Sequence, residues 1–236
     1  MRQVPLPLVA QPLASFESYV AGANSLLLSQ LRAEVPPRSP VYLWGPGGSG
    51  KTHLLRALGL ACAQAGRRVT RFDNDAPNPP LFDEGLCLLI LDDVHLLSPS
   101  AQREAFAWLV EAQAHGVPWV AAGPVPPVDL PLRDDFRSRL GWGQVHALQP
   151  LPEAETRTVL RTEAARRGIP LSDDVLDYLL SRFARDLGHL MRLLDRLDEY
   201  ALSQARPVTV PLLRQMLAES PVQAGQEIQA GLELDA

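Results

Sequence analysis

The segment from Gly45 to Thr52 has the residue types and the spacing of a phosphate-binding loop. It reads Gly-Pro-Gly-Gly-Ser-Gly-Lys-Thr and fits the pattern Gly-x-x-x-x-Gly-Lys-Thr. Glycines at these positions let backbone N–H groups turn inward around an anion without interference from Cβ atoms. The Lys51 ammonium can bind phosphate oxygens, and the Thr52 hydroxyl can hold Mg²⁺. Together with the residue that follows, the predicted phosphate-binding residues are Gly45, Pro46, Gly47, Gly48, Ser49, Gly50, Lys51, Thr52 and His53.

Two carboxylates can supply the second half of such a site. Asp92 and Asp93 follow directly after the apolar run Leu86–Leu91, which is typical of a parallel strand buried on both faces. Ligands of parallel sheets lie beyond the carboxyl ends of the strands, where these two side chains fall. We expect Asp92 to hold Mg²⁺, mostly through water, and Asp93 to polarise the water that attacks a phosphate.

An α/β sheet must hold these groups, and the pattern over residues 15–150 predicts one. Short β-prone runs alternate with helical periodicity, which implies right-handed crossovers and a three-layer core around a five-stranded parallel sheet. The predicted strands are Val41–Trp44, Arg68–Asp73, Leu86–Leu91, Val117–Gly123 and Val145–Leu148. The predicted helices are 25–34, His53–Ala65, Ser100–His115 and Arg133–Leu140.

Residues 151–218 show four helical patterns and no strand pattern, which predicts a small all-α domain after the core. The helices are expected at Glu153–Arg167, from a cap at Ser172 to Arg182, at Asp186–Gln204 and at Val210–Ala218. Residues 1–14 are expected to form an extended tail, and residues 219–236 a frayed one.

Composition places the chain among ordinary globular proteins. Its 236 residues are 46% hydrophobic and 21% charged, which suits one domain with a smaller appendage. We expect a cytoplasmic protein without a membrane partner, because no apolar run approaches the ~20 residues of a span and no signal-peptide pattern is present. Cys62 and Cys87 lack metal-type spacing and are interpreted as core thiols. The net charge of −5 argues against a broad nucleic-acid surface, so sequence-specific DNA binding is not expected.

The proline-rich start of the chain contains a short candidate docking motif. Gln3, Leu6 and Leu8 place an amide and two leucines on an extended backbone. Such a segment can dock into a small apolar groove, with the amide hydrogen bonding at its rim. A disordered terminus is the alternative.

The segment that follows the tail can lie against a nucleotide base. Phe16, Tyr19 and Val20 can supply apolar contact, and Asn24 can cap the next helix. Ordinary core packing is the alternative for each of these residues. The predicted base contacts are Phe16 and Val20.

With its phosphate-binding loop, carboxylate strand and following helical domain, the chain resembles the AAA+ ATPases, and within them the branch that contains the replication initiator DnaA. Residues 16–24, which read FESYVAGAN, resemble the segment that contacts adenine in that branch. Residues 138–143, which read SRLGWG, are similar to its Ser-Arg-Phe-Gly-Trp-Gly stretch. The resemblance covers about residues 3–217 and stops where DnaA would continue into a DNA-binding domain. Together with the tail motif, it is strongest to the Hda family, the regulatory inactivators of DnaA.

This resemblance implies two partners, DnaA and the sliding clamp (β) of DNA polymerase III. In that family the tail binds the clamp, and an arginine finger stimulates hydrolysis of the ATP held by DnaA. Carried onto this sequence, Arg139 is the finger, and the clamp-binding residues are Gln3, Leu6 and Leu8. An arginine after the fourth strand lies away from its own phosphate-binding loop, so it is expected to act on a neighbour. The alternative for Arg139 is a surface ion pair with Asp134 or Asp135.

The sequence departs from the family pattern at two positions that sense the γ-phosphate. The fourth strand ends in Ala122-Gly123-Pro124, without the usual polar side chain, and Gly188 stands where the lid helix usually offers an arginine. We therefore expect bound ADP or ATP with Mg²⁺ and weak or no hydrolysis by the chain itself. The expected function is negative regulation of replication initiation. A helicase loader or replication adaptor ATPase is the alternative, a small-molecule P-loop kinase ranks last, and homo-oligomerisation stays open.

Overall fold

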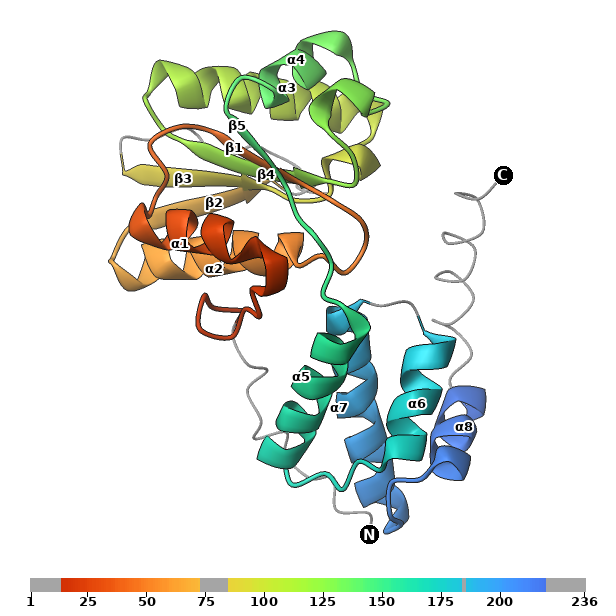
Figure 1. The fold of residues 1–236 in the computed structure, drawn as a ribbon. Coiled ribbons are helices and arrows are strands. Elements are labelled where there is room, and N and C mark those ends of the chain that lie inside the picture. Colours follow the sequence, from red (N-terminus) through yellow and green to blue (C-terminus); the bar gives the residue numbers. More distant parts are fainter. Residues whose placement is uncertain (1–13, 73–84, 184–185, 220–236) are drawn as a thin grey trace, which may run out of the picture. The chain divides into compact units, whose positions relative to one another are not determined.

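A computed structural model describes residues 14–72, 85–183 and 186–219, which form two compact units divided between Pro150 and Leu151. At the centre of the first unit lies a five-stranded sheet with strand order β2-β3-β4-β1-β5, in which every pair is parallel. The strands are β1 Val41–Trp44, β2 Arg68–Phe72, β3 Leu86–Leu91, β4 Trp119–Gly123 and β5 Gln144–Ala147. The predicted α/β fold class, with five parallel strands in a three-layer core and a helical domain after it, is confirmed (Figure 1).

Helices cover both faces of this sheet (Figure 1). They are α1 Ser25–Ala33, α2 Lys51–Gln64, α3 Pro99–Ala114 and α4 Asp134–Leu140, with 3-10 turns η1 Gly22–Asn24, η2 Val94–Leu96 and η3 Pro127–Asp129. Successive strand residues point to opposite faces, so Val41 and Leu43 pack with α1 and α2, whereas Tyr42 packs with α3 and α4.

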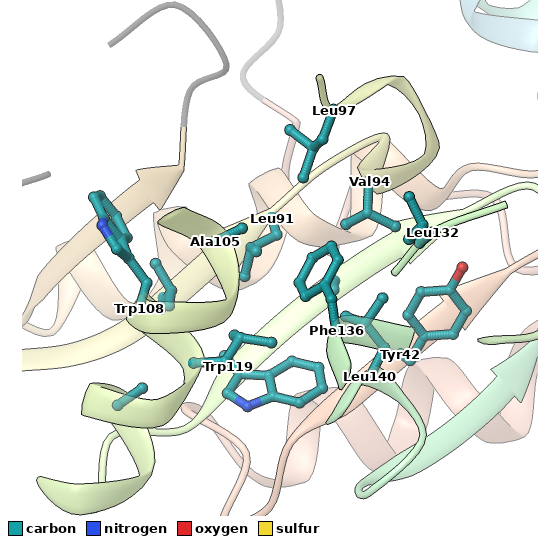
Figure 2. Packing of buried hydrophobic residues seen from close by; sticks show 14 of the residues in the cluster. Tyr42, Leu91, Val94, Leu97, Ala105, Trp108, Trp119, Leu132, Phe136 and Leu140 are labelled. Carbon is teal, nitrogen blue, oxygen red and sulfur yellow. The ribbon is translucent and has the colours of Figure 1, made fainter. Parts of the chain in front are cut away.

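The α3–α4 face is the more aromatic of the two, because its buried cluster contains Tyr42, Trp108, Trp119 and Phe136, whereas that of the α1–α2 face contains Phe16. Figure 2 shows the packing on the α3–α4 face. Trp119 of β4 and Phe136 of α4 are both almost fully buried there beside Tyr42. Burial of side chains this large contributes about 1.5–3 kcal/mol each, which fixes α4 against the sheet. The short helix that carries Arg139 is therefore a rigid part of the core.

In the described part of the second unit, four helices pack around their own apolar cluster. They are α5 Glu153–Arg166, α6 Asp173–Arg182, α7 Leu187–Gln204 and α8 Val210–Glu219. Apolar side chains along one side of α7 lie at the centre of the cluster, with Leu190, Leu194 and Leu197 fully buried. Over the part of the chain that the structure describes, no helix is long and apolar enough to cross a membrane.

The two residues predicted as helix caps occupy the N-cap positions, but their side chains do not form the capping hydrogen bonds. Asn24 is the N-cap residue of α1, but its side chain makes no capping bond. Its amide instead donates to the Gln149 carbonyl at 2.8 Å and accepts from the Gln149 N–H at 2.9 Å. Ser172 likewise precedes α6 without a capping bond from its side chain. A cap prediction from residue type cannot see such competing partners, which lie far away in sequence.

Candidate nucleotide-binding site

The predicted phosphate-binding loop connects the end of β1 to the start of α2. The helix begins at Lys51, earlier than predicted, so its first N–H groups and the positive end of its dipole face the loop. The Lys51 ammonium is 9% exposed and donates to the carbonyl oxygens of Gly45 at 2.6 Å and Pro46 at 2.8 Å. Phosphate oxygens would give this cation stronger, charge-assisted hydrogen bonds than these neutral acceptors do.

Thr52 and Asp92 lie together at the carboxyl ends of β1 and β3, as the sequence predicts. The Thr52 hydroxyl is hydrogen-bonded to the Asp92 carboxylate, and Arg71 of β2 approaches the same carboxylate at 3.6 Å. Burial raises the pKa of Asp92, and the negative charge of Asp93 raises it further, against the opposing effects of Thr52 and Arg71. A partly buried carboxylate next to a second negative charge is well suited to a divalent cation.

The oxygen ligands present fit Mg²⁺ in a nucleotide site. One hydroxyl and one carboxylate, completed by water and phosphate oxygens, are the usual protein share of such a site. Among the described residues there is no group of three His, Cys, Asp or Glu side chains that could hold a metal alone. Thr52 and Asp92 are therefore the residues that would hold Mg²⁺, and the ion would neutralise charge on the phosphates.

Asp93 adopts a backbone conformation that non-glycine residues seldom use. Its φ is 45°, in the left-handed region, and its N–H donates to the Asp92 carboxylate at 3.1 Å. Such strain persists where the surrounding structure requires it, which is common at functional sites. The exposed Asp93 side chain stands at the strand end where a water-activating group is predicted, and that role stays a prediction.

His95 lies in the same site, although no motif in the sequence predicts it there. It lies in η2, and its Nδ1 is buried without a hydrogen-bond partner in the described chain. Burial lowers the pKa of His95, as does the Lys51 charge, whereas Asp93 and Asp92 oppose this effect. The position three residues after Asp92 is the only signal in the sequence that places it here.

Tyr19 links the segment before α1 to the phosphate-binding loop. Its hydroxyl donates to the Ser49 carbonyl at 3.3 Å, and its ring lies 5.4 Å from that of His53. His53 in turn bonds to the carbonyl of Ser15 at 2.8 Å through Nε2. A carbonyl oxygen only accepts, so Nε2 carries a proton and donates this bond, and burial lowers the pKa of the His53 ring.

The two predicted base contacts lie in different surroundings. Phe16 is 6% exposed and packs against the α1 face of the core, while Arg32 donates to its carbonyl and stacks over its ring. Phe16 is thus packed in the core, and its contact with a base stays a prediction. Val20 is partly exposed, and its contact with a base stays a prediction.

Neither of the two positions at which the family resemblance places a γ-phosphate sensor offers a side chain. A Cβ at Gly123 would lie 2.1 Å from the Tyr42 hydroxyl, which occupies that space and donates to the Val125 carbonyl at 3.0 Å. In the lid, Gly188 lies in the first turn of α7, next to the N-cap Asp186, which accepts from the His189 N–H. Tyr42 therefore explains why the residue at the end of β4 is glycine.

Arg139 lies at the edge of the sheet opposite the phosphate-binding loop. It is in the last turn of α4, shortly before β5, whose first residue Gln144 pairs with Val41 at the start of β1. The loop follows Trp44 at the other end of β1, about 10 Å away at the usual rise of a strand.

Arg139 does not form the surface ion pair that was its alternative role. Asp134 pairs with Arg137 at 2.6 Å, and Asp135 pairs with Arg133 at 2.7 Å. Arg139 instead donates to the side-chain oxygen of Gln113. The predicted clamp-binding residues Gln3, Leu6 and Leu8 lie outside the described residues.

The helical unit matches a known family model. Residues 153–217 match the model described as Hda, lid domain. This span contains the whole of α5, α6 and α7 and nearly all of α8.

Several solved structures have a similar fold. Domain III of the replication initiation protein DnaA from Thermotoga maritima is 25% identical with a TM-score of 0.73, over 89% of this chain and 97% of that one. AMPPCP-bound DnaA from Aquifex aeolicus is 21% identical with a TM-score of 0.57, and the match covers 78% of this chain and 66% of that one. A variant of RuvB from Thermotoga maritima is 18% identical with a TM-score of 0.57, and the match covers 88% of this chain and 73% of that one. The two structures below 25% identity support the fold alone. From the core fold, the phosphate-binding loop and the lid match, we conclude that the chain is a DnaA-related AAA+ protein that resembles Hda.

Proposed function

We propose that this protein is a negative regulator of replication initiation that supplies Arg139 to the ATP-binding site of DnaA. The observation that carries the proposal is the position of Arg139, at the edge of its own sheet opposite its own phosphate-binding loop. This position supports action on a nucleotide held by another molecule more than on the nucleotide of the same chain. A guanidinium placed on a neighbour's γ-phosphate stabilises the charge that develops during hydrolysis and is worth about 10³–10⁵ in rate in well-studied NTPases.

The chain's own nucleotide would then have a structural role. The groups for phosphates and Mg²⁺ lie together around Lys51, Thr52 and Asp92, which supports tight binding of ADP or ATP. Gly123 and Gly188 offer no side chain to the γ-phosphate, which supports weak or absent turnover in cis. AMPPCP is bound in the DnaA structure from Aquifex aeolicus that shares this fold, and a nucleotide of the same adenine class is proposed here.

The proposal includes recruitment by the sliding clamp. Gln3, Leu6 and Leu8 would dock in an apolar groove of the clamp and bring Arg139 to DnaA at replicating DNA. Deleting residues 1–8 is expected to abolish clamp binding while leaving nucleotide binding unchanged.

The direct experiment is to mix ATP-loaded DnaA with this protein and DNA-loaded clamp and to follow conversion of ATP to ADP. Wild-type protein should accelerate conversion, and Arg139→Ala should not. Arg137→Ala is a matched control, because Arg137 lies on the same helix but is paired with Asp134. No acceleration by wild-type protein would reject the proposal.

A helicase loader or replication adaptor with its own ATP cycle is the second candidate. The contact between Thr52 and Asp92 favours it, because a complete Mg²⁺ site is compatible with hydrolysis in cis. Steady-state ATP turnover by the protein alone that is abolished by Asp93→Asn and unaffected by Arg139→Ala would support this candidate over the first.

A further inference from the structure

We propose that Gln113 is a positioning residue for Arg139 and that Trp142 completes the support, so that the guanidinium is ordered before any partner arrives. The inference rests on the proposed function of Arg139 and adds the means by which the protein aims that side chain.

Three side chains, two from α3 and one from the turn after α4, surround the guanidinium. Arg139 Nη1 donates to Oε1 of Gln113, in the last turn of α3. Its Cζ lies 4.1 Å from the centroid of the Trp142 ring and 5.8 Å from that of Phe106. A planar cation bonded at one edge and stacked on an indole has few remaining rotamers, so its direction is defined.

These supports are electrically neutral. The two carboxylates on the same helix, Asp134 and Asp135, are engaged by Arg137 and Arg133. Arg139 is therefore oriented by an amide and aromatic rings, which leave its positive charge undiminished. An arginine that only stabilised the surface would gain as much from a carboxylate, whereas one that must bind an anion needs its charge preserved.

The guanidinium also keeps donors for an incoming anion. In the described part of the chain, Gln113 is the one hydrogen-bond acceptor of Arg139, and it uses Nη1 alone. Nη2 and Nε remain to form the paired bonds with which arginine binds phosphate oxygens.

Trp142 is the most conspicuous part of this support because it is 65% exposed. An indole in that position is poorly explained by core packing, since the ring gives little apolar area to the interior. Stacking on Arg139 gives it a function, and aromatic residues beside arginine are typical of the energetic centre of protein interfaces. Ordering the arginine in advance lowers the entropic cost of docking.

The first test uses the fluorescence of Trp142 and does not depend on DnaA. Arg139→Ala should change the tryptophan emission, and the change should vanish in a Trp142→Phe background. Gln113→Ala should reproduce part of the change, because the guanidinium is released from its support. Emission identical to wild type in Gln113→Ala would overturn the proposal, whether or not the protein acts on DnaA.

The second test separates positioning from docking. With ATP-loaded DnaA, Gln113→Ala should lower the plateau rate of hydrolysis about fivefold, the value of one hydrogen bond, at an unchanged half-maximal protein concentration. Glu104→Ala, an exposed change on the same helix, is the control and should match wild type. An unchanged plateau in Gln113→Ala, beside a wild-type protein that stimulates, would overturn the positioning role.

A third variant tests the need for neutrality. Gln113→Glu keeps an acceptor for Arg139, so Trp142 emission should stay close to wild type. Its plateau rate should nevertheless fall, because the carboxylate neutralises the guanidinium. A plateau equal to wild type would show that a neutral support is not required.

Discussion

The ring of Tyr19 fills the space into which a side chain at Gly50 would project. A Cβ at Gly50 would lie 2.5 Å from Cε2 of Tyr19, and the φ of Gly50 is +92°. Residue 50 must therefore be glycine for two independent reasons, its backbone conformation and its neighbour. The contact fixes the segment before α1 against the loop that binds phosphates, so both sides of the nucleotide site are positioned together.

Gly50→Ala should destabilise the core and weaken nucleotide binding. The left-handed backbone alone costs an alanine about 1–2 kcal/mol, and the overlap with Tyr19 adds to this. Urea denaturation and titration with a fluorescent ADP analogue measure the two effects.

The double variant Tyr19→Ala/Gly50→Ala separates the two causes. It removes the overlap but retains the backbone strain, so part of the loss caused by Gly50→Ala should be recovered relative to the Tyr19→Ala background. Full additivity of the two single changes would mean that the ring and the loop do not interact.

The stability of the protein should depend on pH through His53. Burial, opposed in part by the Ser15 carbonyl, lowers the folded-state pKa of His53 below its ordinary 6.5. As pH falls, the unfolded chain binds the proton first, so the free energy of unfolding decreases below about pH 6.5. His53→Gln should therefore lose less stability than wild type between pH 7 and pH 5.

His95 and His146 also have lowered pKa values, and they contribute equally to both proteins in this comparison. The quantity to compare is therefore the difference between wild type and His53→Gln in the free energy of unfolding, measured as a function of pH. Parallel dependence on pH in wild type and His53→Gln would contradict the role assigned to His53.

The two N-cap positions of the lid should respond differently to alanine. The Asp186 carboxylate accepts from the His189 N–H at 3.2 Å, whereas Ser172 makes no capping bond. Asp186→Ala should lower the free energy of unfolding by about 1 kcal/mol, and Ser172→Ala should change it by less than about 0.5 kcal/mol. Hydrogen exchange of the α7 and α6 amides measures each locally, and equal losses would contradict the assignment.

The two cysteines should differ in reactivity. Cys62 is fully buried, and burial together with the neighbouring Cys87 raises its pKa to about 12. Cys87 is partly exposed and lines a cavity of about 390 Å³. Iodoacetamide at pH 8 should therefore modify Cys87 in the folded protein and Cys62 only after unfolding, as measured by mass spectrometry. Equal rates at both thiols would contradict the burial of Cys62.

The sequence predicts those parts of the site whose arrangement follows from a single motif. The phosphate-binding loop motif predicts the strand before it, the helix after it and the position of Lys51. The apolar run of β3 predicts that Asp92 lies at the carboxyl end of that strand. Contacts between segments far apart escape prediction. The approach of Arg71 to Asp92 depends on the register of β2 against β3, and the support of Arg139 by Gln113 depends on how α4 packs on α3.

Asn24 illustrates the same limit in the fold. Its residue type and place before a helix predict a cap, and its backbone does occupy the N-cap position. The side chain nevertheless prefers two hydrogen bonds to Gln149, which lies 125 residues away in sequence. Only the three-dimensional packing reveals that partner.

The most direct measurement of the central claim is single-turnover hydrolysis of ATP bound to DnaA, with DNA-loaded clamp present. Wild-type protein should accelerate hydrolysis strongly, Arg139→Ala should return the rate to that of DnaA alone, and Arg137→Ala should behave as wild type. Arg139→Lys should recover little, because an ammonium lacks the planar fork of donors. Acceleration by Arg139→Ala equal to that of wild type would contradict the claim that this arginine completes the site of another molecule.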